Sequence, residues 1–162
     1  MQSVSKIEKG DLNFDLEDVK TNTILFFVAD FLHQILREET LYNTIFNEIE
    51  VFATELCAKN YNAYIALIFA MLKSQGISPL ISGNEFLEPE TGTFSNIQNH
   101  HLFDADMSII WKNYLTHPNG YELKLNRQER TKTLTSLLVY YQLHFSGFYK
   151  PKSLAIVEDL FS

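Results

Sequence analysis

Apolar residues recur at helical spacing along most of the chain, and this periodicity predicts a mainly helical protein. In the first such segment, which begins near Thr21, Ile24, Phe27, Phe31 and Ile35 form one apolar face. The polar positions of the same segment form a separate stripe of Asp30, His33, Gln34 and Arg37. We therefore expect a first amphipathic helix whose apolar face contributes to the core.

Two further helices are predicted before the first strong stop signal. The second begins near residue 42, where one apolar face comprises Tyr42, Ile45, Ile49, Phe52 and Leu56. The third spans residues 61–72 and is apolar on nearly all sides, so we expect it to be the central, most buried helix. It should end at Gly76 and Pro79, because glycine adopts the left-handed conformation after a helix and proline cannot continue one.

The middle of the chain is rich in turn-forming residues. The stretch "FLEPETGTF" places two short runs around Glu-Pro-Glu-Thr-Gly, which predicts a small β-hairpin with Gly92 at a positive φ. After it, Asp104 is suited to cap a fourth helix. That helix would end before the turn at residues 117–120. Its expected core residues are Met107, Ile110, Trp111 and Tyr114.

A paired start signal predicts the fifth helix. Asn126 is its N-cap, and Glu129, three residues on, can bond back to the N-cap backbone in a capping box. The apolar face comprises Leu134, Leu137, Leu138, Tyr141 and Phe145. Opposite this face, helical spacing predicts a polar stripe of Thr133, Ser136, Tyr140 and His144.

The stretch "YYQLHFSGFYKPKSL", residues 140–154, leads out of that helix. His144 should be half exposed one turn from the helix end, where the helix dipole favours a cationic imidazole. Ser146-Gly147-Phe148 fits a Schellman motif in which Phe148 folds back on Leu143. A sixth helix is predicted from about Ser153. We interpret the stretch as a corner between two helices.

These segments predict a mainly α fold, a helical bundle of about six helices with one small β-hairpin, over residues 21–162. Residues 1–20 are polar and acidic and show no lasting period, which is typical of an entry segment. A chain of 162 residues that is 46% apolar can build one core of ordinary size.

The cysteine content and the apolar runs of the sequence indicate in which cellular compartment the protein works. Cys57 is the only cysteine, which excludes an internal disulfide and a zinc site of paired cysteines and fits a reducing compartment. No signal-peptide pattern opens the chain. The longest apolar run, residues 63–72, is still far shorter than the ~20 residues that a membrane span needs. We expect a cytoplasmic protein without membrane contact.

Charge is distributed unevenly along the chain. The net charge is -7, and residues 1–100 carry 6 Lys and Arg against 14 Asp and Glu, whereas residues 101–162 carry 7 against 6. A surface that binds phosphate should therefore lie in the second part. The candidate DNA-binding cluster, around the start of the fifth helix, is Lys124, Arg127, Arg130 and Lys132. A solvated helix start is the alternative interpretation.

Candidate catalytic and metal-binding groups are sparse. His100 and His101 lie near Asp104 and Asp106, but adjacent histidines on an extended segment point opposite ways. The carboxylate pairs, Glu38–Glu39 and Asp104/Asp106, occur where helix ends use them. The sequence contains no phosphate-binding loop and no nucleophile motif. We expect no metal, cofactor or catalytic residue; the alternative is a hydrolase that uses His144 or His100/His101.

Several stretches resemble the C-terminal helical domain of the recombination mediator RecO, in its form without zinc cysteines. They are "ILFFVADFLHQILREE", "YNTIFNEIE", "LKSQGISP", "FLEPETGTF" and, most specifically, "LLVYYQLHFSGFYKPKSLAIVEDLF". The resemblance covers roughly residues 14–161. It implies that an N-terminal OB-fold is missing here and that residues 1–20 are the linker after it, in a fragment or a shortened natural homologue.

The resemblance implies a role in DNA repair and homologous recombination (the RecF pathway). Because the sequence contains no catalytic motif, we expect this role to involve no enzymatic activity. RecO-like proteins displace or remodel single-stranded DNA-binding protein, anneal strands, and together with RecR help load RecA. The implied partners are thus single-stranded DNA, bound weakly without the OB-fold, RecR and single-stranded DNA-binding protein. A protein–protein adaptor without DNA contact is the alternative.

Two departures from the family pattern stand out. Residues 80–103, which hold four zinc-binding cysteines in many relatives, contain none here, so packing must hold the hairpin. Some relatives bind the acidic tail of single-stranded DNA-binding protein with arginines beside an apolar pocket. Here the third helix has no basic residue between Lys59 and Lys73.

Overall fold

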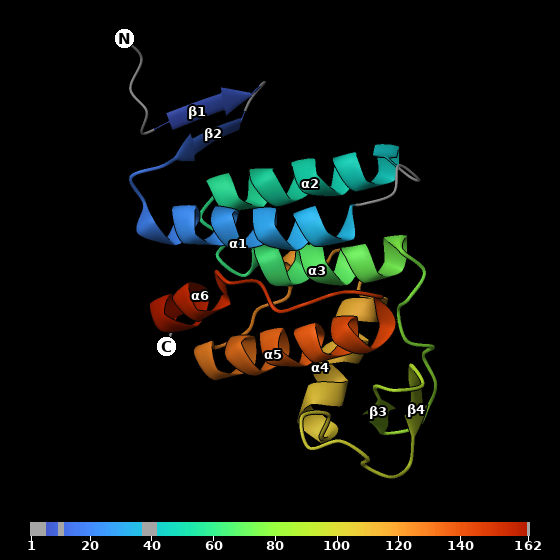
Figure 1. The fold of residues 1–162 in the computed structure, drawn as a ribbon. Coiled ribbons are helices and arrows are strands. Elements are labelled where there is room, and N and C mark those ends of the chain that lie inside the picture. The colour runs from blue at the N-terminus through green and yellow to red at the C-terminus, as the bar shows by residue number, and fades with distance from the viewer. Residues whose placement is uncertain (1–5, 10–11, 37–41, 162) are drawn as a thin grey trace.

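The computed structural model describes residues 6–9, 12–36 and 42–161, and in these ranges the chain forms six α-helices and two small antiparallel sheets (Figure 1). The helices are α1 (Val19–Ile35), α2 (Tyr42–Cys57), α3 (Ala63–Ser74), α4 (Ala105–Thr116), α5 (Arg127–His144) and α6 (Leu154–Phe161). The strands are β1 (Lys6–Lys9), β2 (Leu12–Asp15), β3 (Phe86–Glu88) and β4 (Thr93–Ser95), and a 3-10 turn, η1 (Gly120–Glu122), follows α4. This architecture confirms the predicted fold class.

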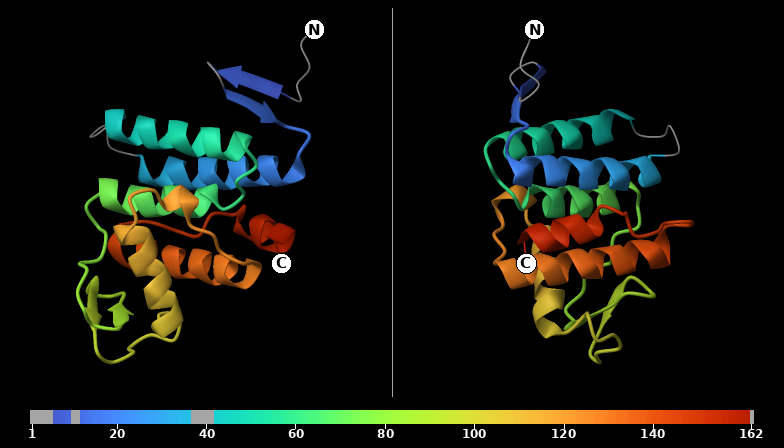
Figure 2. Two further views of the ribbon diagram at one scale, coloured as in Figure 1. Left: turned by 180° about the vertical axis from the view of Figure 1, so that it is seen from behind. Right: turned by 60° about the vertical axis from the view of Figure 1, so that its left-hand side comes forward.

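The helices are arranged around α3. Both figures show α1, α2 and α3 running roughly alongside one another, with α5 and α6 on one side of them and α4 crossing steeply (Figures 1 and 2). Helix α3 contacts α2 as well as α4 and α5, and α6 contacts both α1 and α5. The β3–β4 hairpin lies beside α4, and β2 lies beside α2.

Helix α3 is buried on nearly all sides, as its uniform apolar pattern predicted. Leu67 and Ile68 are fully buried, and Phe69 is 1% exposed. The Phe69 ring stacks on Tyr114 with centroids 4.5 Å apart and meets the edge of Trp111 at 5.0 Å. Aromatic contacts therefore join the central helix to α4.

Local capping signals place the helix boundaries. Asp18 accepts a hydrogen bond from the Lys20 N–H (3.1 Å), so α1 begins two residues before the predicted start. Gly76 has φ +70°, and the Ile77 N–H donates to the Leu72 carbonyl (3.1 Å) in a Schellman arrangement. The predicted end of α3 is thus confirmed.

The β3–β4 hairpin forms as predicted and is held by packing and hydrogen bonds. Leu87 pairs with Phe94 across the strands, and both side chains are buried. The buried Ser108 hydroxyl of α4 accepts from the Leu87 N–H at 2.9 Å. Gly92 has φ +68°, and a Cβ there would lie 3.0 Å from the Tyr140 hydroxyl. Both backbone conformation and space therefore favour glycine at this position.

The predicted polar stripe of α5 is wrong in one respect: three of its four side chains are buried. Thr133 and Ser136 are fully buried and Tyr140 is 1% exposed, whereas His144 is half-buried as expected. The reason is that α5 packs against α3 on one side and against α4 on another. Each polar group has an internal partner; Ser136, for example, accepts from Trp111 Nε1 at 2.9 Å.

The corner between α5 and α6 also differs in its packing. The Phe148 N–H donates to the Phe145 carbonyl at 3.1 Å instead of completing the predicted Schellman bond to Leu143. The Phe148 ring packs on Phe31 and Tyr141, with centroids 6.0 and 5.3 Å away, and Leu143 is 48% exposed. Gln34, expected in the polar stripe of the first helix, is 2% exposed. Its amide exchanges two hydrogen bonds with the backbone of Tyr149, so a tertiary contact overrides the helical pattern.

Within the predicted linker over residues 1–20, β1 and β2 form an antiparallel pair in which Ile7 lies opposite Phe14. Arg37 and the Glu38–Glu39 pair lie outside the described residues. In the described part of the chain, no helix combines the length and apolar character that crossing a bilayer requires.

Candidate nucleic-acid interface

The capping box predicted at the start of α5 is present. The Asn126 side chain accepts from the Glu129 N–H, and the Glu129 carboxylate accepts from the Asn126 N–H, both at 2.8 Å. The helix start therefore satisfies part of its own N–H groups and carries a carboxylate. Both features weaken its attraction for a phosphate.

The structure divides the four predicted DNA-binding residues between two sides of α5. Arg127 is exposed, and Arg130, one turn further, is half-buried. Arg130 Nη1 donates to Asn62 Oδ1 at 2.9 Å, which links α5 to the start of α3. Lys124 and Lys132 are exposed and line a groove toward α4. Two of the four predicted residues thus line this groove, and Arg127 and Arg130 are not among its lining residues.

The groove between α4 and the start of α5 has a volume of about 630 Å³. Met107, Ile110 and Leu125 supply apolar lining. Its charged and titratable groups are mixed: Lys124, Lys132 and His101, with Asp104, Asp106 and Glu129. Because the carboxylates offset the lysines, this groove does not favour phosphate over other ligands.

The two adjacent histidines do not point opposite ways. The rings of His100 and His101 stack with centroids 4.7 Å apart, because the segment turns here instead of running extended. His100 Nδ1 accepts from the Leu102 N–H at 3.1 Å. Asp104 caps α4 through the Met107 N–H (2.8 Å), as predicted. Among the residues that the structure describes, no three His, Cys, Asp or Glu side chains cluster as metal ligands would.

His144 anchors the hairpin loop to α5. Its Nε2 lies 2.6 Å from the Pro89 carbonyl oxygen, and its ring stacks on Tyr140 with centroids 4.2 Å apart. The Tyr140 hydroxyl donates to the Ile77 carbonyl at 2.5 Å. These contacts give His144 a structural position between α5 and the hairpin, a contact that the predicted corner between two helices did not include.

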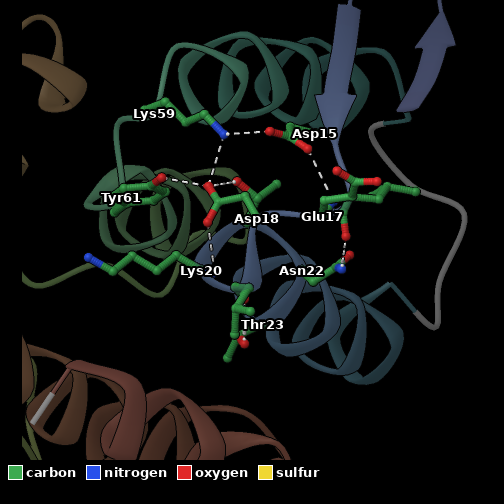
Figure 3. A network of polar contacts seen from close by, with 11 residues as sticks. Asp15, Glu17, Asp18, Lys20, Asn22, Thr23, Lys59 and Tyr61 are labelled. Atoms are coloured by element: carbon green, nitrogen blue, oxygen red, sulfur yellow. Dashed lines mark hydrogen bonds and ion pairs between the residues drawn. The ribbon is translucent and has the colours of Figure 1, made fainter. Parts of the chain in front are cut away.

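A polar network around Asp18, which the sequence pattern did not indicate, joins α1 to the end of α2 (Figure 3). Asp18 accepts hydrogen bonds from the Tyr61 hydroxyl (2.5 Å), Lys59 Nζ (2.9 Å) and the Thr21 hydroxyl (2.8 Å). Burial opposes ionisation of Asp18, but these hydrogen bonds outweigh it and hold the pKa of its carboxyl well below the usual range. The N-cap position of Asp18 was readable from sequence; its distant partners were not.

Lys59 closes the same network from the end of α2. It has φ +66°, the left-handed conformation that usually favours glycine after a helix. Its Nζ also lies 3.6 Å from the Asp15 carboxylate at the end of β2. The network thus fixes β2, α1 and α2 relative to one another.

A second cleft, also about 630 Å³, lies between α2, α3 and the segment at residues 117–121. Val51 and Ala70 contribute apolar surface to it, and the buried Phe69 borders it. Lys73 and His117 are its basic or titratable groups, and Glu48 is its carboxylate. An apolar floor beside a cation suits a short peptide with both apolar and acidic groups.

Comparison with known proteins gives a consistent result. The chain is 31% identical over 153 residues to the DNA repair protein RecO of Azobacteroides pseudotrichonymphae, covering 86% of this chain and 62% of that protein. It is 30% identical over 151 residues to the protein of the same name from Flavobacterium psychrophilum, covering 90% and 63%. With the protein of that name from Christiangramia forsetii it shares 26% over 145 residues, covering 85% and 61%.

The chain thus spans just over three fifths of the length of the curated relatives that it matches. No family model matches it, and no solved structure does.

Proposed function

The chain is a relative of DNA repair protein RecO, and from this relationship we propose that it is a module for DNA repair and homologous recombination that acts by binding, without catalysis. The observation that carries the proposal is the similarity over most of the chain to several proteins that share this one name. Such a module would work in the cytoplasm, where bacterial DNA is found.

Direct DNA contact is the first part of the proposal. The exposed Lys124, Arg127 and Lys132 are its candidate contacts. Arg130 adds positive charge next to them while its side chain is hydrogen-bonded to Asn62. Because the net charge is -7 and carboxylates line the adjacent groove, binding to single-stranded DNA should be weak and should fall steeply with salt.

Contact with repair proteins is the second part. We propose RecR and single-stranded DNA-binding protein as partners. The cleft that contains Phe69 and Lys73 is the candidate site for an acidic tail with apolar residues. Lys73 would supply the cation that the α3 sequence lacks between residues 60 and 72.

Strand annealing in the presence of these partners tests the proposal. Complementary oligonucleotides are coated with single-stranded DNA-binding protein, and the annealing rate is measured with the chain, with RecR, and with both. We expect the chain to accelerate annealing, and RecR to change that acceleration. If annealing is unchanged and the chain co-elutes with neither protein, the proposal is wrong.

Charge reversal locates the DNA contact. Lys124→Glu combined with Lys132→Glu should slow annealing, and Arg127→Glu should do so independently, because each change removes phosphate contacts. Arg130 is left intact, since its reversal would also break the hydrogen bond to Asn62. Lys20→Glu, at the start of α1, is the charge-matched control for Arg127→Glu.

The mixed charge of the groove favours a second candidate, an adaptor that binds proteins without touching DNA. This adaptor would co-elute with RecR or single-stranded DNA-binding protein, yet bind no oligonucleotide at low salt. Binding measurements with each component alone therefore separate the two functions.

A further inference from the structure

Residues 148–153, in the segment between α5 and α6, combine a fixed backbone with exposed aromatic and basic side chains; we name them the α5–α6 loop. The right-hand view of Figure 2 shows the connection between these helices at the edge of the molecule. Phe148, Pro151 and Ser153 are buried, whereas Tyr149, Lys150 and Lys152 are exposed. The buried residues anchor the loop, and the exposed ones form its outer surface.

Tyr149 is held at its backbone and free at its ring. The Gln34 side chain, 2% exposed, donates to the Tyr149 carbonyl at 2.8 Å and accepts from the Tyr149 N–H at 2.9 Å. On the far side, the Ser153 hydroxyl donates to Asp30 at 2.7 Å. The Tyr149 side chain is nevertheless 55% exposed. An ordered backbone lowers the entropy that a ligand must remove when it binds the ring.

The charge around the loop is positive. Lys150 and Lys152 flank Pro151, and the sequence contains no Asp or Glu between Glu129 and Glu158. In the described part of the chain neither lysine forms an ion pair. Asp30 contacts the loop as a carboxylate, because it accepts the Ser153 hydrogen bond, but it forms no ion pair with Lys150 or Lys152. The loop therefore offers two exposed lysines outside any ion pair among the described residues, close in sequence to an exposed aromatic ring.

We propose that the α5–α6 loop is a contact site for single-stranded nucleic acid, in which a base stacks on Tyr149 and Lys150 and Lys152 bind the adjacent phosphates. Proteins that bind single strands combine aromatic stacking with a basic surface in this way. Stacking tolerates any base, so the site should bind without strong sequence preference. The inference deepens the proposed DNA repair function and rests on it.

Fluorescence anisotropy with a labelled dT oligonucleotide of about 20 nucleotides, long enough for one binding site, tests the loop in the intact chain. Tyr149→Ala should weaken binding about 5-fold or more, the lower end of what one stacked base supplies. Tyr149→Phe should bind like the parent, because it keeps the ring. Neither change should alter the dependence on salt, since neither removes a charge.

Replacing the two lysines of the loop should change the salt dependence of binding, which the Tyr149 variants should not. Lys150→Gln combined with Lys152→Gln should weaken binding and lower the slope of log affinity against log salt by about 1.4, or about 0.7 for each phosphate contact. Phe26→Ala, which removes an exposed aromatic ring of α1, and Lys20→Gln should leave affinity and slope unchanged. Because all these side chains are exposed, thermal melting should show that every variant folds.

The outcomes separate this inference from the proposed function. If the parent binds the oligonucleotide and the Tyr149 and lysine variants bind equally well, the loop inference is wrong and the DNA repair proposal stands. If the parent itself does not bind at low salt, both the loop contact and the direct DNA contact are refuted. A loss of affinity in Tyr149→Phe as large as in Tyr149→Ala would also contradict stacking.

Discussion

Replacing Ser136 by alanine should destabilise the protein, although a helical pattern alone predicts a slight gain. Ser136 is fully buried; its hydroxyl accepts from Trp111 Nε1 at 2.9 Å and donates to the Thr133 carbonyl at 2.8 Å. Trp111 is fully buried as well. Alanine would leave the indole N–H without a partner, and such a group costs about 1–3 kcal/mol.

If the Ser136 side chain faced solvent, Ser136→Ala would instead raise the stability of the protein. Alanine has a higher helix propensity than serine, so an exposed Ser→Ala change stabilises a helix by about 0.5 kcal/mol. Urea unfolding followed by the fluorescence of Trp111, the single tryptophan, measures the difference. Gln142→Ala, an exposed change on the same helix, is the control. A Ser136→Ala variant as stable as the parent or more stable, with an unchanged urea slope, would refute the buried hydrogen bond.

Three further predictions concern the core, the Asp18 network and metal content. Phe69→Ala should lower the free energy of unfolding by about 3–5 kcal/mol through lost burial and a cavity, and a urea-measured loss below about 1 kcal/mol would show that α3 is not central. Asp18→Asn keeps the N-cap, but it loses the ionised carboxylate. Because the pKa of Asp18 is lower in the folded than in the unfolded chain, the parent should have a higher free energy of unfolding than Asp18→Asn, fully so above about pH 4 and progressively less as the pH falls further. A difference in unfolding free energy that is the same at about pH 7 and about pH 3 would contradict this. Elemental analysis of protein purified without a His tag should find almost no zinc, whereas one equivalent that stabilises the fold would overturn the prediction.

Local signals explain which elements were predictable. The end of α3 depends on Gly76 and its neighbours, and the start of α5 depends on Asn126 and Glu129, so short stretches of sequence determine both. The polar stripe predicted on α5 is largely buried in the structure. A helical pattern identifies polar positions, but it does not show whether a neighbouring element covers them and supplies hydrogen-bond partners. Ser136 became predictable as buried only once α4 was known to cover it.

The candidate site was less predictable than the fold for the same reason. The spacing of Arg127 and Arg130 indicated a common cationic side, but Asn62, 68 residues from Arg130 in the chain, engages one of them. Likewise, the sequence shows Lys-Pro-Lys after an aromatic run, yet only the distant Gln34 explains why Tyr149 has a fixed backbone. Contacts between remote residues decide which charged or aromatic groups are available to a ligand.

Titration of single-stranded DNA with the parent chain over a series of salt concentrations tests whether this module acts on DNA at all. We expect weak binding at about 50 mM salt whose log affinity falls linearly with log salt, by about 0.7 for each phosphate contacted. No binding at low salt, or an affinity that is the same at about 50 and about 200 mM salt, would contradict direct DNA contact and leave protein binding as the function of the chain.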